Sequence, residues 1–126
     1  MRKLEEWHAG RRANADRYKK AFAGISEVQT PVIDPRAWSI YNQYTLLAEN
    51  RDELLTFLRS KGIGCAVYYP LPLHLQECFN DLGYKEGDFK ISEDLSKKVI
   101  SLPVFGELTK EEQDEVILSV KEFYSK

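Results

Sequence analysis

Between residues 44 and 69 the sequence alternates between apolar and helical patterns, and this alternation indicates the class of fold. The segments YTLLA (44–48) and CAVYY (65–69) are short and apolar, as buried strands are. The segment between them places its leucines at helical spacing, at Leu54, Leu55 and Leu58. A strand, a helix and a strand in this order form a right-handed crossover if the two strands are parallel neighbours.

Helical patterns also occupy both ends of the sequence. The first starts without a capping residue, stops at Gly24 and has one face made of Leu4, Trp7, Arg11, Ala15, Tyr18 and Phe22. The last has one face made of Val116, Ile117, Val120, Phe123 and Tyr124. Because the first pattern starts abruptly, we expect Met1 to be an artificial start and the chain to be the carboxyl-terminal part of a larger protein. The face from Trp7 to Tyr18 and the sheet side near Tyr41 and Tyr69 should then be exposed.

Shorter elements fill the remaining sequence. HLQECFNDLG (74–83) predicts a short helix, YKEGDF (84–89) a turn, and ISLPVF (100–105) a third strand that Pro103 stops. Residues 25–43 contain two prolines and no helical period, which predicts a loop or an irregular extended segment.

These elements amount to three core strands and four or five helices, which is a two-layer α/β or α+β arrangement. The helices should mainly cover one face of a small sheet and leave the other face free for a partner or another domain. Two helices are expected to start at capping boxes, one formed by Asn50 with Glu53 and the other by Thr109 with Glu112. A third helix is expected to start at Ser92 as a single cap.

Composition limits the classes of function. A chain of 126 residues with 43% hydrophobic and 30% charged residues suits one globular domain. A net charge of −2, without a block of five like charges, argues against nucleic-acid binding through a basic face. No apolar run approaches the ~20 residues of a membrane span, and no signal peptide is visible, so we expect a cytoplasmic protein. Two cysteines, Cys65 and Cys78, are too few for a disulfide framework or a zinc site.

The sequence contains no self-sufficient set of catalytic groups. It has no metal-ligand spacing and no glycine-rich phosphate loop, and its lysines lie on polar helical faces or in turns. His8 lies at the edge of the first helical face, which is typical of a surface residue. His74 follows a strand end and a proline turn, where loops often carry function. A structural histidine is the alternative at this position.

Aromatic and polar residues gather around the two predicted strands. Asn42 and Gln43 precede the first strand. Tyr68 and Tyr69 lie at the end of the second strand, and His74 follows it. Rings with a hydroxyl group suit sugar faces, bases or apolar cofactors, and the two prolines of YYPLP stiffen the turn that carries them. A core-anchoring role stays open for Tyr68.

Several ordered motifs resemble the carboxyl-terminal domain of the DegT/DnrJ/StrS-type aminotransferases. The strongest are AVYYPLPLHLQECFNDLGYKEGDF (66–89) and ISEDLSKKVISLPVFGELTKEEQDEV (91–116). The stretches RRANADRYKKAF (11–22) and YNQYTLLAENRDELLTFLRSKGI (41–63) look like the same family. The resemblance covers residues 4–124. Its members are pyridoxal-phosphate enzymes of fold type I that aminate keto-sugars attached to nucleotides.

The resemblance implies that this chain is one domain of a larger enzyme and that the cofactor is bound by another domain. Residues 1–24 would link an absent amino-terminal cofactor domain to the small domain, residues 25–126. The Schiff-base lysine and most of the pyridoxal-phosphate site would lie in that absent domain, so this chain would carry no catalytic residue and be inactive alone. The whole enzyme would be a homodimer that takes its amino group from glutamate.

The same resemblance implies which residues of this chain face the nucleotide-sugar substrate. Tyr69 matches the tyrosine of the family's Y-Y-P or H-Y-P turn, and His74 matches the histidine of its P-L-H motif. Tyr68 stands where many members have histidine, which is a departure from the pattern. Asn42 and Gln43 match the segment before the first strand that approaches the site.

Two other functions stay open. The chain could be a free-standing small-ligand or protein-interaction module without catalysis. The same small-domain plan also serves aminotransferases that act on amino acids or on sugars without a nucleotide.

Overall fold

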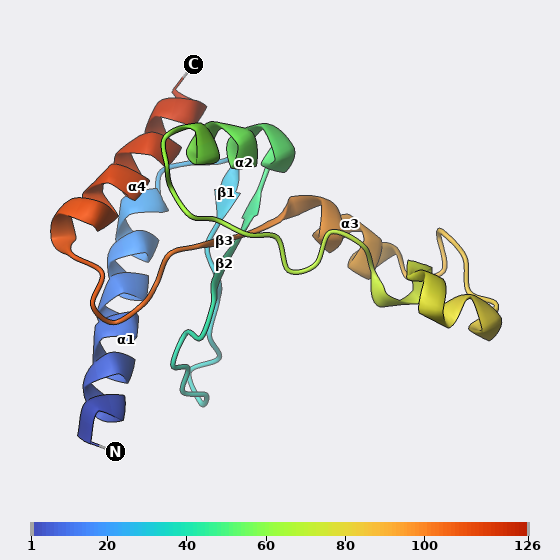
Figure 1. Cartoon of the computed structure of the whole chain (residues 1–126), viewed down its shortest axis with the longest axis horizontal. Coiled ribbons are helices and arrows are strands. Elements are labelled where there is room, and N and C mark those ends of the chain that lie inside the picture. The colour runs from blue at the N-terminus through green and yellow to red at the C-terminus, as the bar shows by residue number, and fades with distance from the viewer. Residues whose placement is uncertain (1, 126) are drawn as a thin grey trace.

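The computed structural model describes residues 2–125 and consists of a body of helices and strands from which an arm projects (Figure 1). We call residues 67–98 the arm and the other described residues the body. The elements in chain order are α1 (Arg2–Phe22), β1 (Val28–Gln29), β2 (Tyr44–Ala48), α2 (Arg51–Ser60), the 3-10 helices η1 (Leu73–Leu75) and η2 (Glu77–Leu82), α3 (Lys90–Lys98), β3 (Val99–Leu102) and α4 (Lys110–Tyr124). None of the helices within residues 2–125 combines the length and the apolar character needed to cross a bilayer.

The sheet has three strands in the order β1, β2, β3, and each pair is antiparallel. In the central strand, Tyr44 lies opposite Leu102 of β3, and both side chains are buried. Successive side chains of a strand point to opposite faces, so the neighbouring pair Thr45 and Ser101 lies on the other face, where the two hydroxyl oxygens are 2.8 Å apart. The sheet therefore has one apolar face and one more polar face.

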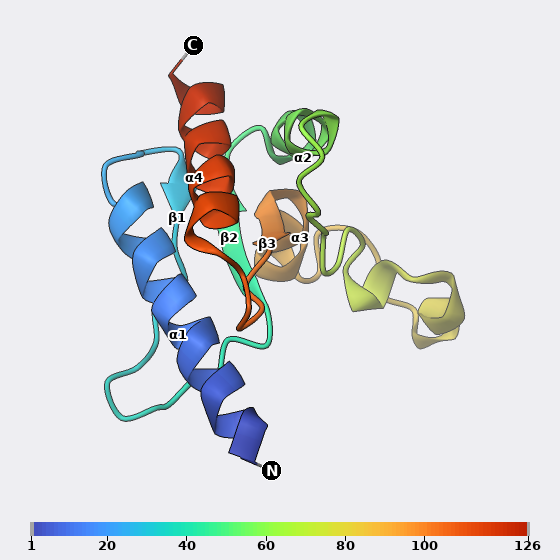
Figure 2. The ribbon, with the colours of Figure 1, turned by 60° about the vertical axis from the view of Figure 1, so that its left-hand side comes forward.

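Helices α1, α2 and α4 pack on the apolar face and form one core with it. Figure 2 shows α1 and α4 side by side next to the strands. The most deeply buried side chains of this core, each at most 1% exposed, include Tyr18, Phe22, Tyr44, Leu46, Leu54, Leu58, Ile100 and Val120. The predicted two-layer arrangement with helices mainly on one face is confirmed.

Polar contacts join α1 to α4 along the line where the two helices meet. Arg17 Nη2 pairs with Asp114 Oδ1 at 2.5 Å, and Arg17 Nη1 donates to the carbonyl oxygen of Lys110 at 3.0 Å. Gln113, which is 1% exposed, donates from Nε2 to the carbonyl oxygen of Asn14 at 2.8 Å. A buried amide must find such a partner, so these contacts fix how the first and last helices are aligned.

The expectation of a bare face on the first helix is met over only part of its length. Ala15 and Tyr18 are buried in the core of the chain itself, whereas Leu4 and Trp7 are 45% and 42% exposed. Tyr69 is also exposed, at 69%, as expected, whereas Tyr41 is half-buried and packs against the core. The sequence period identified the apolar face of α1 but could not separate the half that meets α4 from the half that extends past it.

The predicted strand 65–69 and the parallel crossover are wrong. In this segment one residue, Ala66, pairs with the sheet, and it does so antiparallel to Ser101 through N–O distances of 3.2 and 2.7 Å. Pro70 and Pro72 lack the amide hydrogens that a longer ladder would need. Instead, the third strand is β1, a pair of residues within the segment predicted to be irregular.

One of the three predicted helix caps is present. At Thr109 the capping box is complete: the Glu112 amide donates to Thr109 Oγ1 at 3.2 Å, and the Thr109 amide donates to Glu112 Oε2 at 2.8 Å. The prediction for Asn50 is right in position, because α2 begins at Arg51 directly after it, but the predicted capping box is wrong, because Asn50 has a left-handed backbone (φ 52°) and its side chain makes no cap bond. The prediction for Ser92 is also wrong, because α3 already begins at Lys90.

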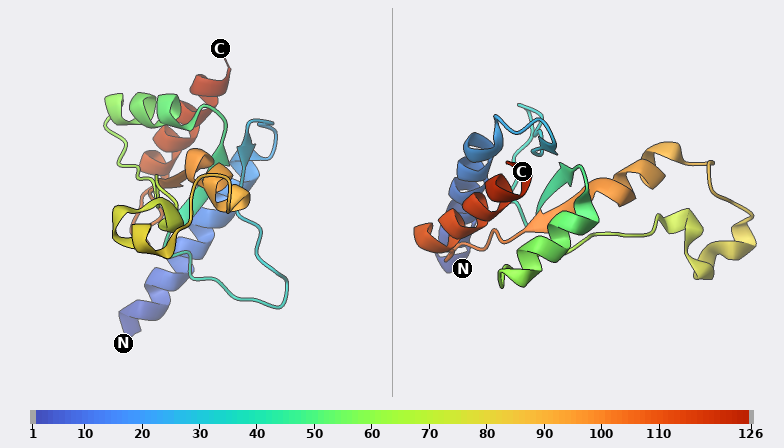
Figure 3. Two further views of the ribbon diagram at one scale, coloured as in Figure 1. Left: turned by 90° about the vertical axis from the view of Figure 1, so that its right-hand side faces the viewer. Right: turned by 90° about the horizontal axis from the view of Figure 1, so that it is seen from above.

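The arm extends from the edge of the sheet, away from α1 and α4, as the two views of Figure 3 show. It leaves the body after Ala66, passes through η1 and η2, turns at Gly83 and Gly87, and returns along α3 into β3. Both glycines have positive φ (76° and 96°), which glycine adopts without strain. The short helix predicted at 74–83 corresponds to η1 and η2, and it ends at Gly83 as expected.

Candidate functional site

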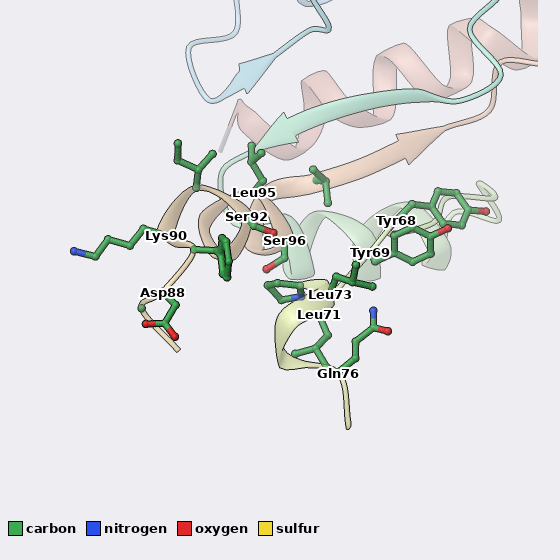
Figure 4. Close-up of a pocket in the computed structure, with 15 residues that line it drawn as sticks. Tyr68, Tyr69, Leu71, Leu73, Gln76, Asp88, Lys90, Ser92, Leu95 and Ser96 are labelled. Carbon is green, nitrogen blue, oxygen red and sulfur yellow. The ribbon is translucent and has the colours of Figure 1, made fainter. Parts of the chain in front are cut away.

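Two hollows meet at Tyr68, where the arm joins the body. The larger one, which we call the arm groove, has a volume of about 1200 Å³ and lies between the segment Tyr69–Leu73 and the segment 87–96 (Figure 4). The smaller one, which we call the strand-end pocket, has a volume of about 330 Å³ and lies where α1, the residues before β2 and the end of β3 come together. Tyr68 lines both.

Three of the five residues predicted to contact substrate line the strand-end pocket, namely Asn42, Gln43 and Tyr68. They come from two segments of the chain and are joined in this pocket by Arg11 from α1 and by Ser101 from β3. The pocket therefore combines amide, hydroxyl and guanidinium groups, which are the donors and acceptors that bind hydroxylated or anionic ligands.

Arg11 holds the bend that precedes β2. Its Nη1 donates to the carbonyl oxygen of Asn42 at 3.1 Å and, more weakly, to that of Tyr41 at 3.5 Å. Tyr41 has a positive φ of 48°, which is uncommon for a residue with a side chain. The arginine thus stabilises the backbone conformation that brings Asn42 and Gln43 to the pocket.

Tyr68 and Tyr69 form one end of the arm groove. Their rings meet edge to face, with centroids 5.8 Å apart, and the peptide bond between them is cis. Tyr68 is 44% and Tyr69 69% exposed, and Figure 4 shows the two rings next to each other, away from α3. These rings are accessible to a ligand, as a substrate-contacting role requires.

His74 lies apart from the other predicted site residues. Its side chain is 8% exposed, and its Nε2 is 2.9 Å from Glu93 Oε1. Its ring also contacts the ring of Phe89, with centroids 4.8 Å apart. His74 lines neither the arm groove nor the strand-end pocket. The structure brings Tyr68 together with Tyr69 in one hollow and with Asn42 and Gln43 in the other, and it places His74 inside the arm.

Glu93 is the partner of several groups in the arm. Burial of the carboxyl group favours its neutral form, but hydrogen bonds from the Gly87 amide, the His74 imidazole and the Phe89 amide outweigh that effect. Together they hold the pKa of Glu93 below its usual value. The carboxylate therefore stays charged at neutral pH and acts as an acceptor.

Sequence reasoning missed Arg11 and Glu93. Arg11 occupies a position on the otherwise apolar face of the first helix, and a charged residue at such a position is a signal of a specific partner. Glu93 lies next to Ser92, the predicted helix cap, and nothing in its local sequence distinguishes it from a solvated glutamate. Its role depends on Gly87 and His74, which the fold brings close.

The cysteines and other potential metal ligands do not form a further site within residues 2–125. No three of the described His, Cys, Asp and Glu side chains are grouped as a metal site requires. Cys65 is half-buried and Cys78 is exposed. Burial raises the pKa of the Cys65 thiol, despite the opposing effect of Arg59, so Cys65 is the less reactive thiol form at neutral pH.

The fold and the two hollows define a small α+β domain that offers binding surface. Comparison with known proteins identifies it further. The model of the DegT/DnrJ/EryC1/StrS aminotransferase family matches residues 1–121, and the chain belongs to this family.

Individual relatives match the chain over nearly its whole length. The chain is 43% identical over 124 residues to the "Pleiotropic regulatory protein" of Geobacillus stearothermophilus, a match that covers 96% of this chain and 33% of that protein. It is 31% identical over 120 residues to the dTDP-3-amino-3,4,6-trideoxy-alpha-D-glucose transaminase of Streptomyces venezuelae, covering 95% and 32%. The crystal structure of DesV from S. venezuelae, in complex with a ketimine intermediate, matches with a TM-score of 0.94 and 30% identity over 98% of this chain and 33% of DesV. The chain spans about a third of the length of these relatives.

Proposed function

We propose that this chain is the small, carboxyl-terminal domain of a pyridoxal-phosphate-dependent aminotransferase that transfers an amino group from glutamate to a keto-sugar nucleotide. Residues 1–24 would link it to an amino-terminal cofactor domain, and the parent enzyme would be a cytoplasmic homodimer. The observation that carries the proposal is the family match over residues 1–121, in a chain that spans about a third of its relatives.

The strand-end pocket and Tyr69 support a role in substrate binding. We assign Asn42 and Gln43 to hydrogen bonds with sugar hydroxyl groups, because each side chain carries both a donor and an acceptor. Tyr68 and Tyr69 would contact the sugar or the base with their rings. Arg11 would keep the Asn42–Gln43 segment in place and add a positive charge near a nucleotide phosphate.

Pyridoxal phosphate does not fit the residues that this chain provides. The cofactor is held covalently by a lysine amine, and the described lysines are exposed or half-buried. One lysine, Lys90, is among the residues that line the two hollows. Its side chain is exposed at the arm groove. We therefore assign the cofactor, which supplies the amino-transfer chemistry, to the rest of the parent enzyme, and to this chain only contacts on the substrate side.

The exposed apolar residues of the arm support the presence of a covering domain. Leu73, Leu82 and Ile91 are 64%, 58% and 79% exposed. Large apolar side chains that stay exposed on a soluble protein can mark a contact surface. We propose that other parts of the parent enzyme cover this surface.

Activity of the full-length parent protein tests the proposal. With glutamate and a panel of keto-sugar nucleotides, we expect 2-oxoglutarate and one amino-sugar nucleotide to form in equal amounts, measured by mass spectrometry. Tyr68→Phe should raise KM for the sugar nucleotide. Tyr84→Phe is the matched control, because Tyr84 lies in the arm but lines neither hollow. A parent enzyme that transaminates amino-acid substrates or sugars without a nucleotide, and no keto-sugar nucleotide, would contradict the proposed substrate class.

The 126-residue chain alone provides the second part of the test. We expect it neither to transaminate nor to form an imine with pyridoxal phosphate. An imine absorbance band that borohydride abolishes would contradict the assignment of the cofactor to the rest of the enzyme. Binding of a small ligand or another protein by a parent without transaminase activity would favour a binding module instead.

A further inference from the structure

We infer that His74 is a positioning residue that holds the two walls of the arm groove at a fixed separation through its contact with Glu93. The contact is a property of the chain itself. Its consequence for substrate binding rests on the proposed function.

The two walls of the arm groove come from separate segments of the arm. One wall is formed by the chain from Tyr69 to Leu73, which leads into η1. The other is formed by residues 87–89 and the first turns of α3. His74 directly follows the first wall, and Glu93 lies in the first turn of α3, next to Ser92 of the second wall. A contact between these two side chains therefore ties one wall to the other.

Glu93 connects to both segments at once. Its carboxylate accepts hydrogen bonds from the Gly87 amide, at 2.9 Å to Oε1 and 3.0 Å to Oε2, and from the Phe89 amide at 3.2 Å. These bonds shape the loop of the second wall. The bond to His74 Nε2, at 2.9 Å, is the one that reaches η1. Because a carboxylate only accepts, Nε2 carries the proton and donates.

The burial of the pair makes this bond a strong link. The side chains of His74 and Glu93 are 8% and 11% exposed. A hydrogen bond to a charged acceptor contributes more than a neutral one, and loss of one partner leaves the other buried and unsatisfied. His74 is also absent from the lining of the groove, so it acts on a ligand through the geometry of the walls rather than by contact.

Amide hydrogen exchange in the 126-residue chain tests the link. In η1, the Leu75 amide donates to the Pro72 carbonyl at 3.0 Å and the Gln76 amide to the Leu73 carbonyl at 3.2 Å. In His74→Leu we expect these two amides to exchange roughly tenfold faster or more, from the loss of one charge-assisted bond. The Gly87 amide should keep its protection, because Glu93 still accepts from it.

Two further variants separate the hydrogen bond from packing. His74→Gln should restore the protection of Leu75 and Gln76, because the amide nitrogen of glutamine can take the place of Nε2. His8→Leu is the matched control, because it removes the other histidine of the chain, which contacts Trp38 on the body. It should leave the arm unchanged.

Three results would overturn the inference. One is unchanged exchange of Leu75 and Gln76 in His74→Leu. Another is failure of His74→Gln to restore them, which would indicate a packing role. The third is loss of protection that spreads in His74→Leu to the Ser101 amide of the body, which would indicate a role in global stability.

Kinetics of the full-length enzyme test the consequence for the site. We expect His74→Leu to raise KM for the sugar nucleotide about tenfold with kcat within about twofold, and His74→Gln to restore KM. An unchanged KM, or a loss confined to kcat, would overturn the positioning role. A parent without transaminase activity would contradict the proposed function, whereas the exchange result would still decide whether His74 links the two walls.

Discussion

Tyr18 and Tyr44 lie against each other in the core, with ring centroids 5.1 Å apart, but their hydroxyl groups have different surroundings. Tyr18 donates to the carbonyl oxygen of Pro103 at 2.9 Å. The Tyr44 hydroxyl is buried without a hydrogen-bond partner among the described residues. A buried polar group without a partner is unfavourable, whereas a satisfied one contributes to stability.

The two tyrosines therefore predict opposite results for the same substitution. Tyr18→Phe should lower the free energy of unfolding by about 1 kcal/mol, because it leaves the Pro103 carbonyl without its donor. Tyr44→Phe should leave the free energy of unfolding unchanged or raise it. Urea denaturation of both variants checks this, and each variant controls for ring packing in the other. Equal destabilisation by both would contradict the difference in their surroundings.

The carboxyl group of Glu93 predicts a pH dependence of the arm. Its pKa is lowered in the folded chain, so its stabilising contribution is complete above the pKa of the unfolded chain, about 4.3. The contribution is then lost as the pH falls through the lower pKa of the folded state. The amide resonance of Gly87, which depends on this carboxylate, should move in that acidic range.

Two variants check the origin of that pH dependence by nuclear magnetic resonance. In Glu93→Gln the acidic transition of the Gly87 resonance should disappear. Asp34→Asn is the control, because the carboxyl of Asp34 also has a lowered pKa, through its contact with Arg36, but lies outside the arm. A transition that persists in Glu93→Gln would assign it to another group.

At the scale of elements, α1 approaches the loop after β3 more closely than a side chain would allow. A Cβ atom on Gly10 would lie 2.6 Å from the carbonyl oxygen of Gly106 and 2.9 Å from its Cα. In the reverse direction, a Cβ on Gly106 would lie 3.0 Å from the Cα of Trp7. The helix tolerates a glycine in its interior because this close contact requires one.

Gly10→Ala should therefore destabilise the chain although alanine favours helices. We expect the clash with backbone atoms to exceed the gain in helix propensity of ~1 kcal/mol, with a net loss of roughly 1–3 kcal/mol in the free energy of unfolding. Gly24→Ala is the control, because nothing lies within 4 Å of its added Cβ. It should change stability by less than about 0.5 kcal/mol. A thermal or urea unfolding series that finds Gly10→Ala neutral would contradict the close contact.

The elements also differ in how well the sequence predicted them. Helices α1, α2 and α4 were predicted because each has a clear apolar period, and strands β2 and β3 were predicted because each is a short apolar run. The segment CAVYY has a strand composition, but one of its residues, Ala66, pairs with the sheet before the chain enters the arm. Strand β1 has two residues, too few for any period, and it exists because β2 offers a free edge. The cap at Thr109 was found because both of its partners are local.

The candidate site was less accessible to sequence reasoning than the fold. Tyr68, Asn42 and Gln43 were placed in one site through the resemblance, and they share the strand-end pocket. The tie between His74 and Glu93 links residues 19 positions apart, and no local pattern indicates it. Whether the predicted residues bind substrate stays a prediction.

At the scale of the whole molecule, the arm and the body should differ in local stability. The buried residues of the arm are Pro72, Glu93 and Ser96, whereas the body contains the whole apolar core. Regions with little buried apolar surface open without global unfolding. We expect the amides of η1 and η2 to exchange through local openings that are insensitive to low urea, whereas those of β2 and β3 exchange through global unfolding. Equal urea dependence in both regions would contradict this.

The alignment of α1 with α4 through Arg17 and Gln113 has a consequence for biosynthesis. Helix α1 leaves the ribosome before β2 and α4, and the contact between Asn14 and Gln113 joins residues 99 positions apart. Until α4 has emerged, the aromatic side chains of α1 and β2 lack the cover that closes the core. Because long-range contacts of this kind form slowly, we expect the apolar side chains of α1 and β2 to be prone to aggregation during translation until α4 is complete.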